Sequence, residues 1–229
     1  MQSSAPPNTL PVGYSAVPPG HVATVVTSLE MRSRPAPPAV LSWPPGYSLE
    51  PLVGATPERY RALYRLVGED WLWFSRLVMP DDELRSILND TGVHVFSLRA
   101  GERDAGILEL DFRKPDDCEL AFFGLAPGVI GKGIGRMLMN EALERAWSQP
   151  IKRLWVHTCT LDHPAALGFY QRSGFVAYRT QVEILPDRGS PERWRGTARL
   201  MFRSCPPDNL PGLLIRRRSD ILRAQRICV

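Results

Sequence analysis

A glycine-rich turn in the middle of the chain, between an expected strand and an expected helix, constrains the fold most. The segment before it, Cys118–Leu125, is apolar and rich in aromatic residues, which is typical of a strand. After it, apolar residues recur at steps of three and four, as in an amphipathic helix: Ile134, Met137, Leu138, Ala142 and Ala146. Backbone N–H groups at the start of such a helix point outward, and the helix dipole favours an anion there. The turn therefore predicts a phosphate-binding site.

Two common phosphate-binding patterns do not fit this turn. A P-loop needs Ser or Thr after Gly131-Lys132 and Gly five residues before it, but Gly133 and Ala126 occupy those positions. The dinucleotide fingerprint needs a third glycine where Arg136 stands. What remains, Ile130-Gly131-Lys132-Gly133-Ile134-Gly135, resembles the acyl-CoA pyrophosphate loop of the GNAT acetyltransferase superfamily, written R/Q-x-x-G-x-G/A. Ile130 stands where that pattern has Arg or Gln.

A second segment resembles the other signature of the same superfamily, N-x-x-A-x-x-[LF]-Y-x-x-x-G-F. It covers residues 163–175, where the pattern's fixed positions are filled by Ala166, Tyr170, Gly174 and Phe175. His163 replaces the asparagine. With both signatures in the expected order, the chain is identified as a member of the GNAT superfamily. The resemblance implies an α/β fold, with a mixed central sheet flanked by helices and splayed strands that form an acyl-CoA groove.

The expected domain organisation has three parts. Residues 1–47 form a proline-rich extension with one strand at about 21–31, interpreted as an extra edge strand or an arm that packs on a neighbouring subunit. Residues 48–183 form the acetyltransferase domain, in which strands and helices alternate. Residues 184–229 form a tail rich in Arg and Pro, in which a closing strand is expected near 196–203.

Charge and cysteine content bound the class of protein. The net charge is +4, and residues 203–229 alone hold six arginines and two aspartates, so the rest of the chain is close to neutral. Nucleic-acid binding is therefore not expected of the domain, and only the tail could act as a nucleic-acid adaptor. We expect neither a secretory signal nor a membrane span. The four cysteines have no paired spacing, which predicts reduced thiols in a cytoplasmic protein.

The resemblance implies that acetyl-CoA is the cosubstrate. The backbone around Leu125 would hydrogen-bond the pantetheine arm, and amides from Gly131 to Arg136 would hold the pyrophosphate. Lys132 or Arg136 could add positive charge. The cofactor-binding residues expected on this basis are Leu125, Ala126, Gly131, Lys132, Gly133, Ile134, Gly135, Arg136, His163 and Ala166.

Acetyl transfer to an amine also needs a proton donor for the departing thiolate and a base for the amine. Tyr170 matches the superfamily's usual general acid. Two residues are candidates for the base. Glu119, expected on one strand face with Ala121 and Phe123, matches the catalytic glutamate of the histone-acetyltransferase branch. His157 stands where ribosomal-protein acetyltransferases carry a glutamate, and a histidine titrates near neutral pH without much tuning. A structural ion pair for Glu119 and a core position for His157 are the competing interpretations.

The acceptor side of the site is expected near the first two helices of the domain. Trp71, Trp73 and Phe74 could form its wall, or they could be core aromatics. We expect no metal site, because His157, Cys159 and His163 match no usual ligand spacing. The sequence thus predicts an N-acetyltransferase that uses acetyl-CoA and acts on a small-molecule, peptide or protein amine. The alternative is an acyl-CoA-binding module that senses its ligand without turnover. A homodimer is conceivable through exchange of the early strand.

Overall fold

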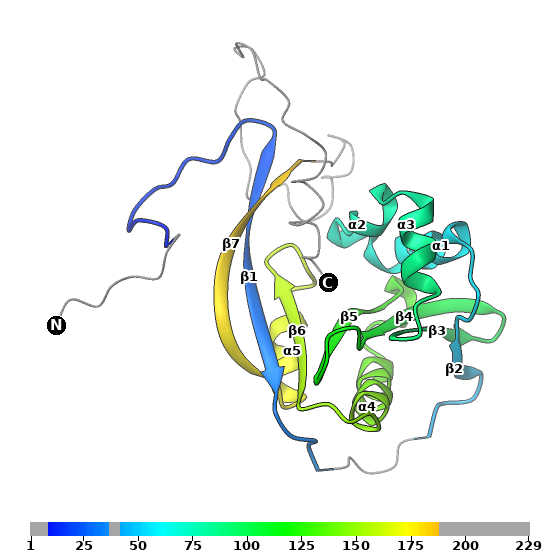
Figure 1. Ribbon diagram of the computed structural model, residues 1–229. Helices are drawn as coiled ribbons and strands as arrows, with labels where there is room; N and C mark the ends of the chain where they lie inside the picture. The colour runs from blue at the N-terminus through cyan, green and yellow to red at the C-terminus, as the bar shows by residue number, and fades with distance from the viewer. Residues whose placement is uncertain (1–8, 37–41, 188–229) are drawn as a thin grey trace. The chain divides into compact units, whose positions relative to one another are not determined.

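A computed structural model describes residues 9–36 and 42–187, and Figure 1 shows the order of the elements along the chain. The described residues fall into two compact units. The larger unit comprises residues 25–181, and the smaller one joins residues 9–24 to residues 182–187. In the smaller unit the Asp187 N–H donates to the Gly20 carbonyl at 2.8 Å. The closing strand expected near 196–203 and the arginine-rich tail lie outside the described residues.

The strands form a seven-stranded mixed sheet in the order β2-β3-β4-β5-β6-β1-β7. Their bounds are β1 His21–Met31, β2 Tyr47–Pro51, β3 Val93–Ala100, β4 Arg103–Asp111, β5 Asp117–Leu125, β6 Arg153–Cys159 and β7 Val176–Pro186. The β2–β3, β3–β4, β4–β5 and β1–β6 pairs are antiparallel, whereas β5 and β6 are parallel. This mixture of strand directions is the α/β arrangement that the sequence predicts.

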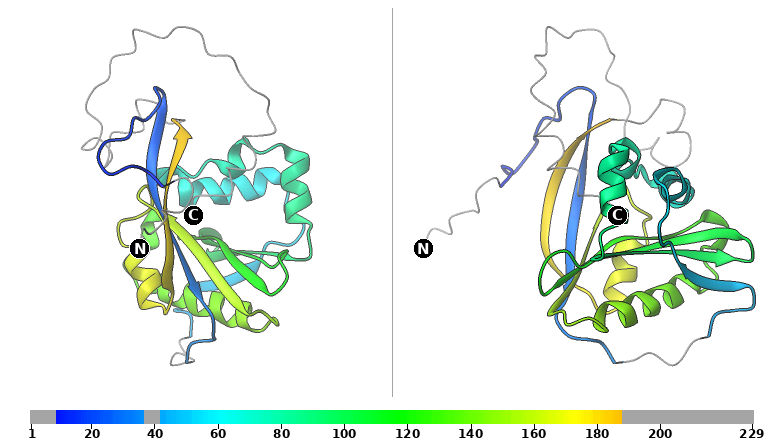
Figure 2. Two further views of the ribbon diagram at one scale, coloured as in Figure 1. Left: turned by 60° about the vertical axis from the view of Figure 1, so that its left-hand side comes forward. Right: turned by 45° about the vertical axis from the view of Figure 1, so that its right-hand side comes forward.

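Helices cover both faces of the part of the sheet formed by β3, β4 and β5. The α-helices are α1 Pro57–Gly68, α2 Ser75–Val78, α3 Asp81–Leu88, α4 Ile134–Trp147 and α5 Ala166–Arg172, and short 3-10 helices are η1 Glu69–Trp71 and η2 Pro127–Val129. As Figure 2 shows, α1 and α3 lie on one face and α4 on the other. The start of α1 follows the sequence rule, because the Thr56 hydroxyl accepts from the Arg59 N–H and Pro57 is in the first turn.

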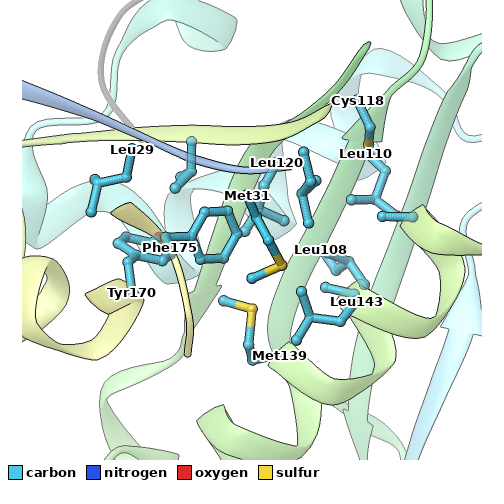
Figure 3. Packing of buried hydrophobic residues seen from close by; sticks show 14 of the residues in the cluster. Leu29, Met31, Leu108, Leu110, Cys118, Leu120, Met139, Leu143, Tyr170 and Phe175 are labelled. Atoms are coloured by element: carbon cyan, nitrogen blue, oxygen red, sulfur yellow. The ribbon is translucent and has the colours of Figure 1, made fainter. Parts of the chain in front are cut away.

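The core beneath α4 and α5 joins residues from both halves of the chain. Figure 3 shows Leu29 and Met31 of β1 beside Tyr170, Phe175 and Met139 of α4. Leu29 is fully buried, and burying a leucine side chain is worth about 1.5–3 kcal/mol relative to leaving it exposed.

The early strand has a different place from the one that the sequence suggested. β1 lies between β6 and β7 in the strand order, so it is neither an edge strand nor a free arm. Its residues Val26 to Met31 pair with Cys159 to Leu154 of β6. The larger unit accordingly begins at Val25, whereas the sequence suggested a domain that starts at residue 48.

A β-bulge in β5 changes the faces on which its side chains lie. Phe122 pairs with Glu109 of β4, but Leu120 pairs with the next residue, Leu110, so Ala121 is the extra residue. Ala121 and Phe122 both pack in the core beneath α1, while Phe123 packs against the core beneath α4. The sequence predicted that Ala121 and Phe123 both lie on the same strand face as Glu119. This prediction is wrong for Phe123, because the bulge places it on the opposite face of the sheet.

Candidate functional site

The sheet opens between β5 and β6, at the carboxyl ends of this parallel pair. Pairing between them covers only Asp117–Glu119 with Arg153–Trp155. Beyond this point β5 stays with β4, and the Ala126 N–H donates to the Ala105 carbonyl at 2.9 Å. Because successive residues of a strand direct their backbone groups to alternate sides, the N–H and C=O of Leu125 point away from β4 and into the opening. In parallel sheets such openings at carboxyl ends are where ligands bind.

A pocket of about 880 Å³ occupies this opening. Its size is in the range of small-molecule and cofactor sites. It is lined by the segment after β1, the end of α1 and the segment that follows it, β5, the turn before α4, α4 itself, the loop before α5, and α5 with the turn after it. The lining residues include Trp71, Trp73, Phe123, Gly124, Leu125, Ile130, Gly131, Gly133, Gly135, Arg136, Asp162, His163, Ala166, Phe169, Tyr170 and Arg172.

The glycine-rich turn forms one end of this pocket. Gly131 and Gly133 have φ values of 83° and 78°, in the left-handed region where a residue with a side chain is strained. Gly133 is also the N-cap of α4 and supplies no capping side chain. The Arg136 N–H donates to the Gly133 carbonyl at 3.2 Å, and Ile134 and Gly135 carry the other N–H groups of this first turn. Of the residues expected at this site, Lys132, Ile134 and Ala126 do not line the pocket. The side chains of Ile134 and Ala126 are instead buried in the core beside η2.

Tyr170 lies on α5 and lines the same pocket. The side chain is buried and is packed against Phe123, Phe169 and Phe175, with ring centroids 6.2, 5.8 and 5.9 Å away. Burial raises the pKa of the Tyr170 hydroxyl well above its ordinary value, and the negative charge of Asp162 raises it further. The proton thus stays on the oxygen at neutral pH, as a proton donor requires.

Glu119 and His157 are neighbours on β5 and β6, but neither lines the pocket. The Glu119 Oε1 and His157 Nδ1 atoms are 3.8 Å apart. Burial lowers the pKa of His157 to about 4, and its Nε2 is buried with no hydrogen-bond partner among the described residues. His157 is therefore neutral at pH 7, and a group with so low a pKa is a weak base there.

Asp162 is a pocket residue whose role the sequence did not reveal. Its side chain is buried in the loop between β6 and α5. The Oδ2 atom accepts from the Thr158 hydroxyl and from the Cys159 N–H, both at 2.7 Å, while Oδ1 accepts from the Trp73 indole N–H at 3.4 Å. Burial raises the pKa of this carboxyl to about 6. These bonds tie the Asp162 loop back to β6, and α5 begins only later, at Ala166.

The predicted acceptor-side aromatics divide into two groups. Trp71 and Trp73 both line the pocket, and Phe74 does not. Trp73 is also buried in the core beneath α1, so this residue is both a core aromatic and part of the pocket wall. Trp71 packs edge-on against His163, with ring centroids 5.1 Å apart. His163 accepts from the Ala165 N–H through Nδ1 at 3.1 Å and thereby shapes the loop before α5.

Comparison with known proteins identifies the class. Residues 60–175 match the acetyltransferase (GNAT) family, and because this match covers half of the chain, the chain belongs to that family. A comparison with curated proteins found no match.

Two solved structures with TM-scores above 0.5 share the fold. A GCN5-related N-acetyltransferase from Sphaerobacter thermophilus has a TM-score of 0.54 at 16% identity, over 74% of this chain and 54% of that one. A Drosophila protein has a TM-score of 0.54 at 12% identity, over 73% and 52%. A GCN5-related N-acetyltransferase from Kribbella flavida has a TM-score of 0.47 at 16% identity, over 75% and 61%. This chain thus covers between about half and three fifths of the length of these structures.

Residues 9–36 and 42–187 contain neither a membrane-spanning helix nor a group of metal ligands. No helix there has the length and apolar character needed to cross a membrane. The same residues bring together no group of three or more His, Cys, Asp or Glu side chains that could hold a metal ion.

Proposed function

We propose that this protein transfers an acetyl group from acetyl-CoA to a primary amine. The observation that carries the proposal is a single pocket at the β5–β6 opening that contains both the glycine-rich turn of α4 and Tyr170. An anion site and a proton donor in one cavity are what a CoA thioester requires, because one end of the molecule is a pyrophosphate and the other becomes a thiolate.

The residues around the opening suit an acyl-CoA molecule. The amides that follow Gly131 and Gly133 would hold the pyrophosphate, with Arg136 and Arg172 as the basic side chains of the lining. The backbone of Leu125 would bond to the pantetheine arm, like a further strand beside β5. The apolar lining around Phe123 would exclude water from the thioester, which strengthens electrostatic interactions at the reacting carbonyl.

In the proposed reaction the neutral amine attacks the thioester carbonyl directly. Tyr170 donates its proton to the sulfur as the C–S bond breaks, because it is the buried hydroxyl of the pocket that keeps its proton at neutral pH. Glu119 and His157 remain candidates for the base only through intervening water, since neither reaches the lining.

A second function, acyl-CoA binding without turnover, is favoured by one observation. Ile130 lines the pocket and is 40% exposed, at the position where the related loop pattern has Arg or Gln. The loss of a charged or amide contact there would weaken the grip on the pyrophosphate. Backbone amides would still provide most of that grip, so we rank catalysis first.

Calorimetric titration with acetyl-CoA, CoA, ATP and NAD, followed by assays of CoA release with a panel of amines, tests both functions. Catalysis predicts binding of acetyl-CoA and CoA only, with an acetylated amine detected by mass spectrometry. Binding without release on any amine would favour the sensing module. Failure to bind acetyl-CoA, or equal binding of ATP, would refute both.

A further inference from the structure

We propose that Asp162 receives the acceptor amine, and that the acceptor is a monoamine with an apolar body. This proposal rests on the proposed function and deepens it. It assigns a chemical class to the acceptor and gives Asp162 a role in binding and deprotonation of the amine.

The charges of the lining restrict the acceptor. Among the described residues that line the pocket, Asp162 is the single acidic side chain, and the basic ones, Arg136 and Arg172, lie on α4 and α5. One acid can pair with one ammonium group. A polyamine or an aminoglycoside would place its remaining ammonium groups in a cavity without counter-charges, at a large desolvation cost.

The wall next to Asp162 is aromatic. The Trp73 indole donates to Asp162 itself, and Trp71, on the same segment after α1, also lines the pocket. Indole faces attract cations and also pack well against apolar groups. A single carboxylate on an aromatic wall therefore suits an ammonium group that is attached to an apolar or aromatic body.

The hydrogen bonds of Asp162 leave one oxygen for the ligand. Oδ2 is fixed by two bonds of 2.7 Å, from Thr158 and from the Cys159 backbone. Oδ1 has a longer contact of 3.4 Å with Trp73, so it can accept a shorter, charge-assisted bond from an ammonium group. The charge of Asp162 also acts on the Tyr170 hydroxyl, which brings the proposed proton acceptor and proton donor to one part of the pocket.

The proposed step removes two protons from the ammonium nitrogen and moves the acetyl group from sulfur to that nitrogen. The ammonium group gives one proton to Asp162 Oδ1, which passes it to solvent. The nitrogen then attacks the carbonyl carbon, the C–N bond forms, and the C–S bond breaks with its electron pair on sulfur. Sulfur takes a proton from Tyr170, and the second amine proton returns to the Tyr170 oxygen through water. The sum is an ammonium ion and a thioester giving an amide, a thiol and one proton.

The pH dependence follows from the surroundings of Asp162. The titratable groups around it are Cys159 on β6, His163 in the same loop and Tyr170 on α5, with Arg136 and Arg172 in the same lining. With the carboxyl pKa raised to about 6 by burial, the active carboxylate form is lost as pH falls through that value. We therefore expect kcat/KM to fall below about pH 6.

Binding of defined probes tests the recognition step without turnover. Wild-type protein and Asp162→Asn are titrated in saturating CoA with 2-phenylethylamine, its uncharged counterpart 2-phenylethanol, spermidine and phenylalanine. We expect 2-phenylethylamine to bind most tightly, and Asp162→Asn to weaken it by roughly 10- to 100-fold, as for a hydrogen bond to a charged group. Binding of 2-phenylethanol should not change by more than about twofold. Tighter binding of spermidine or phenylalanine, or unchanged binding of 2-phenylethylamine in Asp162→Asn, would overturn the proposal.

The pH profile separates a catalytic role from a structural one. Thr158→Val removes one donor to Oδ2 but keeps the carboxyl, so the acidic limb of kcat/KM should move to higher pH by roughly 0.5–1 unit. Asp162→Asn should lose that limb together with most of the activity, while CoA still binds. Glu119→Gln should keep the limb, and an acidic limb that follows Glu119 instead would overturn the assignment of the base.

The two proposals can fail separately. The wild-type protein could bind 2-phenylethylamine in an Asp162-dependent way but fail to bind CoA. This result would reject acetyl transfer and keep the amine site. Turnover of polycationic amines that Asp162→Asn leaves unchanged would keep acetyl transfer and reject the amine site.

Discussion

The hydroxyl of Tyr170 can be removed with little other change. Tyr170→Phe keeps the packing against Phe123 and Phe175, so we expect acetyl-CoA to bind as before and the protein to stay folded. A lost general acid should lower kcat by roughly 10²- to 10⁴-fold. Single-turnover CoA release, with calorimetry of CoA binding as the control, measures this. Unchanged kcat would mean that water protonates the thiolate.

A buried ion pair between β4 and α2 has a structural role. Glu109 is fully buried, and its Oε1 accepts from Arg76 Nη2 at 2.6 Å, while Oε2 accepts from the Tyr60 hydroxyl. Glu109→Gln leaves the Arg76 charge buried without its counter-charge, and should lower the free energy of unfolding by roughly 3 kcal/mol in urea titrations. Glu50→Gln, which alters the 3.8 Å pair between the exposed Glu50 carboxylate and Arg99, is the matched control and should cost less than about 1 kcal/mol. Equal losses in both variants would refute this view of Glu109.

At the residue scale, the site residues that could be named from the sequence are those that belong to short, continuous sequence motifs. Tyr170, Gly131, Gly133 and Gly135, which were named from two sequence motifs, all line the pocket. Asp162 was missed because its contact with the aromatic wall of the pocket is non-local: Trp73 lies 89 residues earlier in the chain. No periodicity or spacing around position 162 encodes that contact.

The turn before α4 depends on backbone conformation more than on side chains. Gly133→Ala places a side chain at φ 78°, which costs roughly 1–2 kcal/mol or forces the turn to rearrange. We expect weaker acetyl-CoA binding, by about tenfold for such a cost. Gly128→Ala is the control, because a Cβ there meets nothing within 4 Å and its φ is not positive. Calorimetric titration of both variants with acetyl-CoA measures this. Equal affinities of the two variants for acetyl-CoA would show that the turn does not hold the pyrophosphate.

At the element scale, most helices and strands were predictable because each has its own pattern. The early strand has the predicted bounds, and the Thr56 cap marks the start of α1. The bulge at Ala121 was not predictable, since it arises from the register between β4 and β5. The bulge also explains why simple alternation of side chains along β5 wrongly placed Phe123 on the same face as Glu119.

β1 should contribute to stability as an inner strand does. Leu29 is fully buried, whereas Val25, in the same strand, is 41% exposed. Leu29→Ala should lower the free energy of unfolding by about 2–5 kcal/mol, and Val25→Ala by no more than about 1 kcal/mol. Urea denaturation of both variants measures this. Similar small losses would indicate that β1 is loosely attached.

For the whole molecule, two buried groups make opposite contributions to the pH dependence of stability. The pKa of His157 is lowered to about 4 in the folded protein, so the unfolded chain binds the proton first, and acidification from pH 6.5 to 4 destabilises the fold. The pKa of Asp162 is raised to about 6, so protonation favours the folded state between pH 6 and the ordinary value of 3.8.

The difference in free energy of unfolding between wild type and each variant, measured as a function of pH, separates these contributions. The stability of the wild type relative to His157→Gln should fall by roughly 3 kcal/mol between pH 6.5 and 4. Relative to Asp162→Asn, wild-type stability should instead rise as pH falls from 6 to 4. Unfolding titrations at half-unit steps of pH give both curves, and slopes of the same sign would contradict the burial of one of the two groups.

The position of β1 has a consequence for how the chain folds as it is synthesised. The Val25 N–H donates to the hydroxyl of Thr160, 135 residues further along the chain, so β1 leaves the ribosome long before its partner strand exists. Such long-range pairing is slow because the intervening chain must first be brought together. The elements from β2 to β5, which pair with near neighbours, can assemble during this interval. Until β6 of the same chain has been synthesised, the apolar residues of β1 would be exposed and could bind chaperones or β6 of another copy.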